Sequence, residues 1–97
     1  MPAYILAQVE VHDSAAFAAY SARVTPVVAA HGGRFLVRGG AQDRREGSAP
    51  ERRIVILEFA SMAGAQGFYD SADYAPLLAM RMACSAADFV IVEGVPG

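Results

Sequence analysis

The sequence has 97 residues, enough for a single domain spanning residues 1–97, and a domain of this size buries only a thin core of its own. The formal net charge is -2, with no lysine and with arginine as all eight cations, so no basic field is present that would recruit nucleic acid or an anionic membrane. Hydrophobic residues make up 55% of the chain and charged residues 19%, which is more apolar material than two layers normally hide and predicts a homo-oligomer.

The first 32 residues predict a strand followed by a helix. Residues Ala3 to Val11 are apolar at first and then alternate, as in a strand with one face leaving the core. Asp13 or Ser14 then supplies a helix cap, and apolar residues recur at spacings of three and four up to Gly32, which ends the helix. Pro26 disfavours helical geometry before it, so we expect the helix to bend or restart there.

The middle of the chain predicts two strands joined by a long loop. Gly33 to Gly39 is a strand in which simple alternation puts Arg34, Leu36 and Arg38 on one face. The segment from Gly40 to Glu51 is rich in Gly, Ser, Pro and charge and is typical of an exposed loop. The strand from Arg52 to Ala60 is apolar on both faces except at Glu58, which indicates a central strand.

The last third predicts two helices and a strand. Ser61 is a cap for a helix that runs to Asp70. The next helix begins at Ser71 or Asp73, and Pro76 favours the later start because a proline in the first turn sacrifices no hydrogen bond. We expect the final strand over Asp88 to Glu93.

This order of elements defines a fold class. Right-handed crossovers convert strand, helix, strand, strand, helix pair and strand into an α+β, ferredoxin-like βαββαβ fold with a four-stranded antiparallel sheet. Helices cover only one face of such a sheet. The other face carries Leu, Ile and Val, and pairing it with a second copy would close a dimeric α+β barrel.

Three segments in order resemble a known family. They are His-Gly-Gly-Arg-Phe-Leu-Val-Arg-Gly-Gly from His31, Val-Ile-Leu-Glu-Phe from Val55, and Phe-Tyr-Asp-Ser-Ala-Asp-Tyr from Phe68. Together they resemble the domain of unknown function 1330 family, within the dimeric α+β barrel superfamily, over Ala3 to Val95. The resemblance implies the fold and a homodimer. It implies no particular reaction, because the superfamily includes cofactor-free monooxygenases, haem-degrading enzymes, chlorite dismutase-like proteins and muconolactone isomerase-like enzymes.

Arg38 and Glu58 are the charged pair of greatest interest, because each ends an otherwise apolar strand face on strands expected to be hairpin neighbours. A carboxylate removed from water is costly unless it is paired. One interpretation is therefore that the two side chains pair with each other. In the functional interpretation, Arg38 holds a ligand carboxylate and Glu58 acts as a catalytic acid or base.

Other residues have both a structural and a functional interpretation. Tyr20, Tyr69 and Tyr74 lie on the predicted helices, where each can pack in the core or present a hydroxyl to a pocket. His31 either caps the end of its helix or acts there as a catalytic cation. Arg81 follows Tyr74 by seven residues on the same helical stripe, so it lines a pocket mouth with that tyrosine or stays solvated or ion-paired.

The remaining polar residues give little indication of a functional site. Arg44, Arg45, Arg52 and Arg53 are interleaved with acidic residues, as in a solvated loop or lid. The two histidines have no metal-ligand spacing and no phosphate-loop or dinucleotide motif is present, so we expect no metal and no cofactor. One cysteine, no apolar leader and no run of roughly 18–20 apolar residues predict a cytoplasmic protein that does not enter a membrane.

Two functions remain open from the sequence. The first is a homodimeric small-molecule-binding or cofactor-independent enzymatic domain for a small apolar, acid-bearing metabolite, with Arg38 as the anion anchor. The second is a non-catalytic dimer with a structural or regulatory role. A pocket with convergent polar groups favours the first, and a fully packed interior favours the second.

Overall fold

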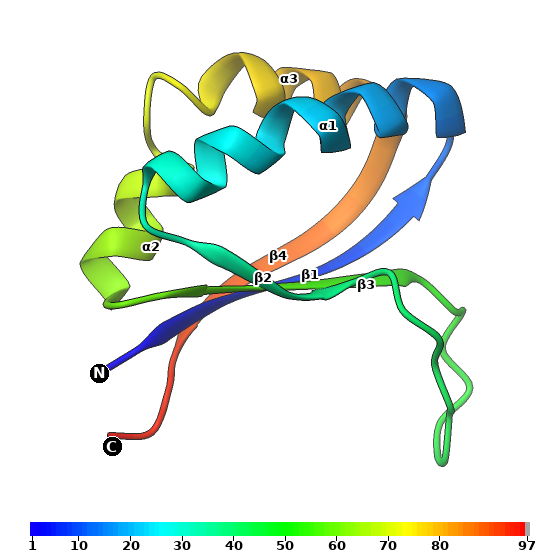
Figure 1. Ribbon diagram of the computed structural model, residues 1–97. Helices are drawn as coiled ribbons and strands as arrows, with labels where there is room; N and C mark the ends of the chain where they lie inside the picture. The colour runs from blue at the N-terminus through cyan, green and yellow to red at the C-terminus, as the bar shows by residue number, and fades with distance from the viewer. Residues whose placement is uncertain (97) are drawn as a thin grey trace.

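The computed structural model describes residues 1–96 and contains four strands and three helices (Figure 1). In chain order these are β1 (Ala3–Val11), α1 (Ser14–Ala30), β2 (Arg34–Arg38), β3 (Arg53–Phe59), α2 (Met62–Tyr69), α3 (Ala75–Cys84) and β4 (Ser85–Glu93). The strands form one antiparallel sheet in the order β2-β3-β1-β4. All three helices lie on one face of it (Figure 1). The expected α+β, ferredoxin-like fold is confirmed.

Helix α1 forms as its sequence pattern predicts and is continuous through Pro26. The side chain of Asp13 accepts the backbone N–H of Ala16 at 3.0 Å and caps the first turn. The helix does not restart at Pro26, because the buried Val24 and Val28 on either side anchor both halves of one continuous helix to the sheet.

The last strand is longer than expected. β4 begins at Ser85, directly after α3, whereas the sequence analysis placed its start at Asp88. Ser85 pairs with Val11 at the far end of β1, so the strand is extended by pairing with β1. The small residues Ala86 and Ala87 carry no local signal for a strand, so the sequence alone does not indicate this extension.

A β-bulge in β2 changes the direction of Arg38. Phe35 is paired with Leu57, yet Val37 is paired with Ile56, so one extra residue, Leu36, lies between them. Beyond the bulge the alternation is reversed. The expectation that Arg34 and Arg38 share a face is therefore wrong: Arg34 is on the open face of the sheet, and Arg38 faces the helices.

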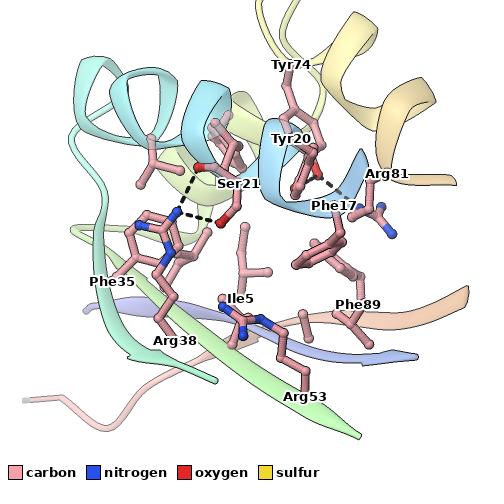
Figure 2. Close-up of a pocket in the computed structure, with 17 residues that line it drawn as sticks. Ile5, Phe17, Tyr20, Ser21, Phe35, Arg38, Arg53, Tyr74, Arg81 and Phe89 are labelled. Atoms are coloured by element: carbon pink, nitrogen blue, oxygen red, sulfur yellow. Dashed lines mark hydrogen bonds between the residues drawn. The ribbon is translucent and has the colours of Figure 1, made fainter. Parts of the chain in front are cut away.

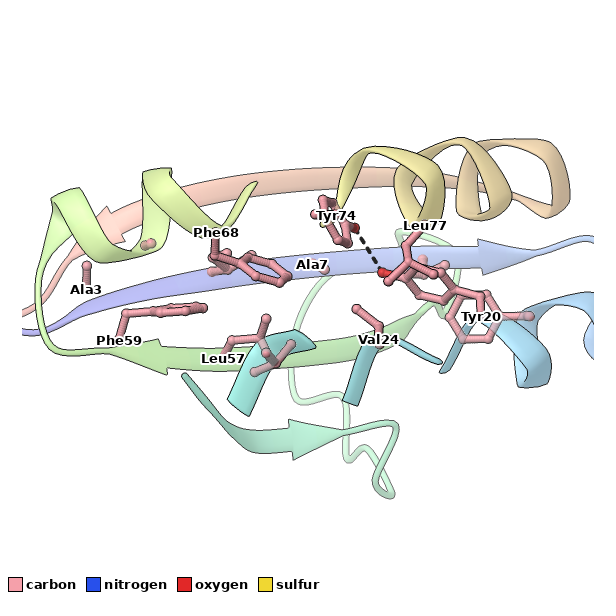
Figure 3. Packing of buried hydrophobic residues seen from close by; sticks show 14 of the residues in the cluster. Ala3, Ala7, Tyr20, Val24, Leu57, Phe59, Phe68, Tyr74 and Leu77 are labelled. Carbon is pink, nitrogen blue, oxygen red and sulfur yellow. Dashed lines mark hydrogen bonds between the residues drawn. The ribbon is translucent and has the colours of Figure 1, made fainter. Parts of the chain in front are cut away.

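The core lies between the sheet and the helices. Its largest fully buried side chains include Phe59, Phe68 and Tyr74, and Figure 3 shows them between β1, β3 and the helices. The opposite face of the sheet is open in the single chain. An apolar row crosses all four strands on that face in register, formed by Val37, Ile56, Leu6 and Val90. Within residues 1–96, no helix combines the length and the apolar character needed to cross a membrane.

Candidate functional site

A cavity of about 40 Å³ lies between the sheet and helices α1 and α3 (Figure 2). Most of its wall is apolar, with aliphatic residues of β1 and β3 and aromatic rings from α1, β2, α2 and β4. Its polar lining consists of Tyr20, Ser21, Arg38, Arg53, Tyr74 and Arg81. Apolar walls with a few convergent polar groups are typical of small-molecule sites.

Arg38 enters this cavity from the edge strand β2 because of the bulge. One terminal nitrogen of its guanidinium donates to the backbone oxygen of Ser21 at 2.7 Å, to the Ser21 hydroxyl at 2.8 Å and to the Thr25 hydroxyl at 2.8 Å. The guanidinium lies 4.0 Å from the centroid of the Phe35 ring. Helix α1 thus holds the arginine across the gap to β2, through neutral acceptors only.

Arg53 is a site residue that the sequence analysis missed. It was assigned to the solvated loop, yet it pairs in register with the buried Val9 and lines the cavity. Its Nε is buried without a hydrogen-bond partner. Gly39 has a positive φ of 70°, which favours glycine. A Cβ at this position would also collide with the Arg53 guanidinium. The alternation of β3 was a usable signal, because Arg53 shares the face of Leu57.

Arg81 is the most deeply buried cation, with 4% of its surface exposed. Its Nε donates to the Tyr74 hydroxyl at 3.3 Å, and its guanidinium lies 4.0 Å from the centroid of the Phe89 ring. The Tyr74 hydroxyl also forms a hydrogen bond of 2.9 Å with that of Tyr20. Burial, and after it the neighbouring Tyr74, raises the pKa of Tyr20, so this phenol stays protonated at neutral pH.

The three cavity arginines have no carboxylate partner in the described part of the chain. The ion pairs there that involve arginine use Arg34, Arg45 and Arg52 instead. Of the three, Arg81 is buried, Arg53 is half-buried and Arg38 is exposed, so the cost of a charge without a counterion falls mainly on Arg81, and the cavity wall offers no acidic side chain to offset it. The arrangement therefore favours a ligand that brings negative charge into an apolar space.

The structure separates Glu58 from Arg38. Glu58 lies on the open face of the sheet, where Arg34 Nε donates to its Oε1 at 2.7 Å. The expected pairing of Arg38 with Glu58 does not form, because the bulge directs Arg38 to the opposite face. Glu58 is accordingly outside the cavity lining.

Of the other predicted site residues, Tyr20, Tyr74 and Arg81 meet in the cavity and two do not reach it. His31 ends α1, and its Nε2 lies 3.2 Å from Asp73 Oδ2, outside the cavity lining. Tyr69 packs behind the cavity, with its ring centroid 5.5 Å from that of Tyr74. Within residues 1–96 no cluster of His, Cys, Asp and Glu side chains is placed to hold a metal ion.

The chain has an α+β fold in which one four-stranded antiparallel sheet and the helices on one of its faces enclose the cavity. Residues 2–95 match the family described as "Domain of unknown function (DUF1330)", and the chain belongs to this family. No curated protein matches the sequence.

Two solved structures share the fold at low identity. One is a protein of unknown function from Rhodopseudomonas palustris, with a TM-score of 0.80 and 18% identity over 99% of this chain and 84% of that chain. The other is SnoaB, a cofactor-independent oxygenase from Streptomyces nogalater, with a TM-score of 0.73 and 14% identity over 99% of this chain and 95% of that chain. At these identities the similarity shows the fold.

Proposed function

We propose that this protein binds a small organic acid in the cavity between the sheet and the helices, and that it acts as a homodimer. The observation that supports the proposal is the convergence of Arg38, Arg53 and Arg81 on one apolar cavity with no carboxylate among its lining residues. An acid would supply the missing negative charge. Its hydrocarbon part would contact the aliphatic and aromatic walls.

The ligand's size follows from the cavity. About 40 Å³ is far less than the roughly 300–1,000 Å³ of typical drug-sized pockets. A short-chain acid therefore fits better than a nucleotide or a large aromatic compound, and the Arg38 side chain, which is exposed on β2, is the group best placed to shift on entry. A cavity with several convergent polar groups favours this function over a purely structural dimer.

An enzymatic role without a cofactor remains part of the proposal. SnoaB, which shares the fold, is a cofactor-independent oxygenase. In this chain, the residues placed to act on a bound acid are Tyr20 and Tyr74, which line the cavity and whose hydroxyls are hydrogen-bonded to each other beside Arg81. The catalytic roles predicted for Glu58 and His31 have no support from the cavity lining. A cytoplasmic location stays a prediction that rests on the sequence.

Replacement of Arg38 by methionine tests the site. Met preserves much of the aliphatic stem and removes the charge, and a hydrogen bond to a charged group contributes about 1.5–3 kcal/mol. We expect Arg38→Met to weaken binding of pentanoate by roughly 10–150-fold in titration calorimetry.

Arg34→Met is the matched control for this experiment. It removes the same residue type from the same strand, but on the open face beside Glu58, so pentanoate affinity should change less than twofold. Equal affinities of the native protein and Arg38→Met would contradict the anchor role. Absence of pentanoate binding to the native protein, together with no binding of butanoate or hexanoate, would overturn the proposed function.

The homodimer is proposed on the open face of the sheet. The apolar row of Val37, Ile56, Leu6 and Val90 would otherwise remain in water. Contiguous apolar surface of this kind is typical of an interface between protein chains. The same row from a second copy would be self-complementary, as a two-fold symmetric interface requires.

A further inference from the structure

The two tyrosine hydroxyls in the cavity have one more proton than the chain uses. Tyr20 and Tyr74 share a single hydrogen bond, in which either oxygen can be the donor. Each phenol has one proton to donate. Whichever hydroxyl donates within the pair, the proton of the other remains without an acceptor among the hydrogen bonds of residues 1–96.

Arg81 limits the hydrogen bonds that the Tyr74 hydroxyl can form. Its Nε donates to the Tyr74 oxygen, so one acceptor position of that hydroxyl is already used. An arginine donates hydrogen bonds and does not accept them. The chain Arg81–Tyr74–Tyr20 therefore ends in a donor, and the positive charge at its other end polarises that donor toward an electron-rich oxygen.

Because both tyrosines are buried, a phenolic proton without an acceptor has a free-energy cost. Tyr74 is 1% exposed and Tyr20 is 7% exposed, so bulk water has little access to either hydroxyl. A buried donor left without an acceptor costs about 1–3 kcal/mol. The neighbouring wall is formed by apolar side chains such as Phe17 and Phe89, which offer no oxygen (Figure 2).

We infer that the ligand of this cavity is a short oxo acid, with its carboxylate at Arg38 and Arg53 and a carbonyl oxygen at the Tyr20–Tyr74 pair. This inference rests on the proposed function, because it needs an acid in the cavity, and it adds the second polar group of that acid. A carbonyl oxygen accepts the spare proton and brings no proton of its own. A ligand hydroxyl would bring a further proton, and the nearby acceptors for it, the Ser21 hydroxyl and the two phenolic oxygens, already take part in hydrogen bonds.

Matched pairs of acids test the inference on the native protein. The probes are pentanoate with 4-oxopentanoate, and hexanoate with 5-oxohexanoate, compared by titration calorimetry. We expect at least one of the two oxo acids to bind about tenfold more tightly than its own parent acid. We expect 4-hydroxypentanoate to bind no more tightly than pentanoate. Equal binding within both pairs, or a hydroxy acid as tight as the oxo acid, would overturn the inference.

The variant Tyr20→Phe with Tyr74→Phe removes both hydroxyls and keeps both rings. The double change is required because either single variant leaves one phenolic proton free. We expect the preference for the oxo acid over its parent acid to fall below twofold, with an unchanged circular dichroism spectrum as evidence that the variant is folded. Tyr69→Phe, which alters a tyrosine behind the cavity, should keep the full preference.

The outcomes separate the two proposals. If none of the acids binds the native protein, the proposed function itself falls. If the acids bind but the preference survives the double variant, or Tyr69→Phe abolishes it, then only the assignment of the carbonyl oxygen to this pair falls. If the double variant does not fold, the comparisons on the native protein still decide the oxo-acid inference.

Discussion

Replacement of Phe68 by alanine should lower the free energy of unfolding by about 3–5 kcal/mol, because it empties the centre of the core. The Phe68 ring lies 5.4 Å from the centroid of Phe59 and 4.7 Å from that of Tyr74, and its side chain is fully buried. A small domain has only about 5–15 kcal/mol of total stability, so this loss is a large share. Chemical denaturation followed by circular dichroism measures it.

Phe35→Ala is the matched control for that measurement. This variant replaces the same type of side chain on the edge strand β2, where Phe35 is only half-buried. Its loss should be clearly smaller, at about half or less. A loss under about 1 kcal/mol for Phe68→Ala would show that the ring does not carry the packing between α2 and the sheet.

Introduction of a charge into the apolar row should dissociate the proposed homodimer. Val90 lies on the open face with 53% of its surface exposed in the single chain, so Val90→Glu should fold normally. In the dimer the new carboxylate would be buried without a partner, at a cost of several kcal/mol. We expect the dimer dissociation constant to rise at least about hundredfold, as measured by sedimentation equilibrium.

Val95→Glu makes the identical substitution beyond β4, where 82% of the side chain is exposed. This control should remain a dimer. A native protein that sediments as single chains at micromolar concentration would contradict the proposed dimer. Sedimentation of Val90→Glu as an unchanged dimer would place the interface elsewhere on the molecule.

The open face and the cavity are connected through one loop. Residues 39–52 join β2 to β3 and extend from the sheet on the side away from the helices (Figure 1). Arg38 and Arg53 flank this loop, and Arg52 anchors its end to Asp88 through an ion pair of 2.9 Å. The loop therefore begins and ends beside two arginines that line the cavity.

Local sequence signals were sufficient for most of the fold. The caps at Asp13 and Ser61 and the proline in the first turn of α3 act through neighbouring backbone groups, so each is readable from a few residues. The apolar periodicity of α1 predicted its buried face, which carries Phe17, Tyr20, Val24 and Val28. The starts of two elements differ from the expectation: α3 begins at Ala75, later than Ser71 or Asp73, and β4 begins at Ser85, three residues before Asp88. Ser85 joins β4 through its pairing with Val11, which lies 74 positions earlier in the chain.

The sequence by itself determined the elements, their order and which residue types were available for a site; the tertiary structure decided which of them meet. Strand alternation is a local rule, and the bulge at Leu36 that overrides it depends on how β2 pairs with β3. Because of that single extra residue, Arg38 lies in the cavity that Arg53 also lines. Glu58 forms its ion pair with Arg34 instead. The face of the sheet on which a side chain lies depends on how its strand pairs with the next strand, and this pairing joins residues far apart in the chain.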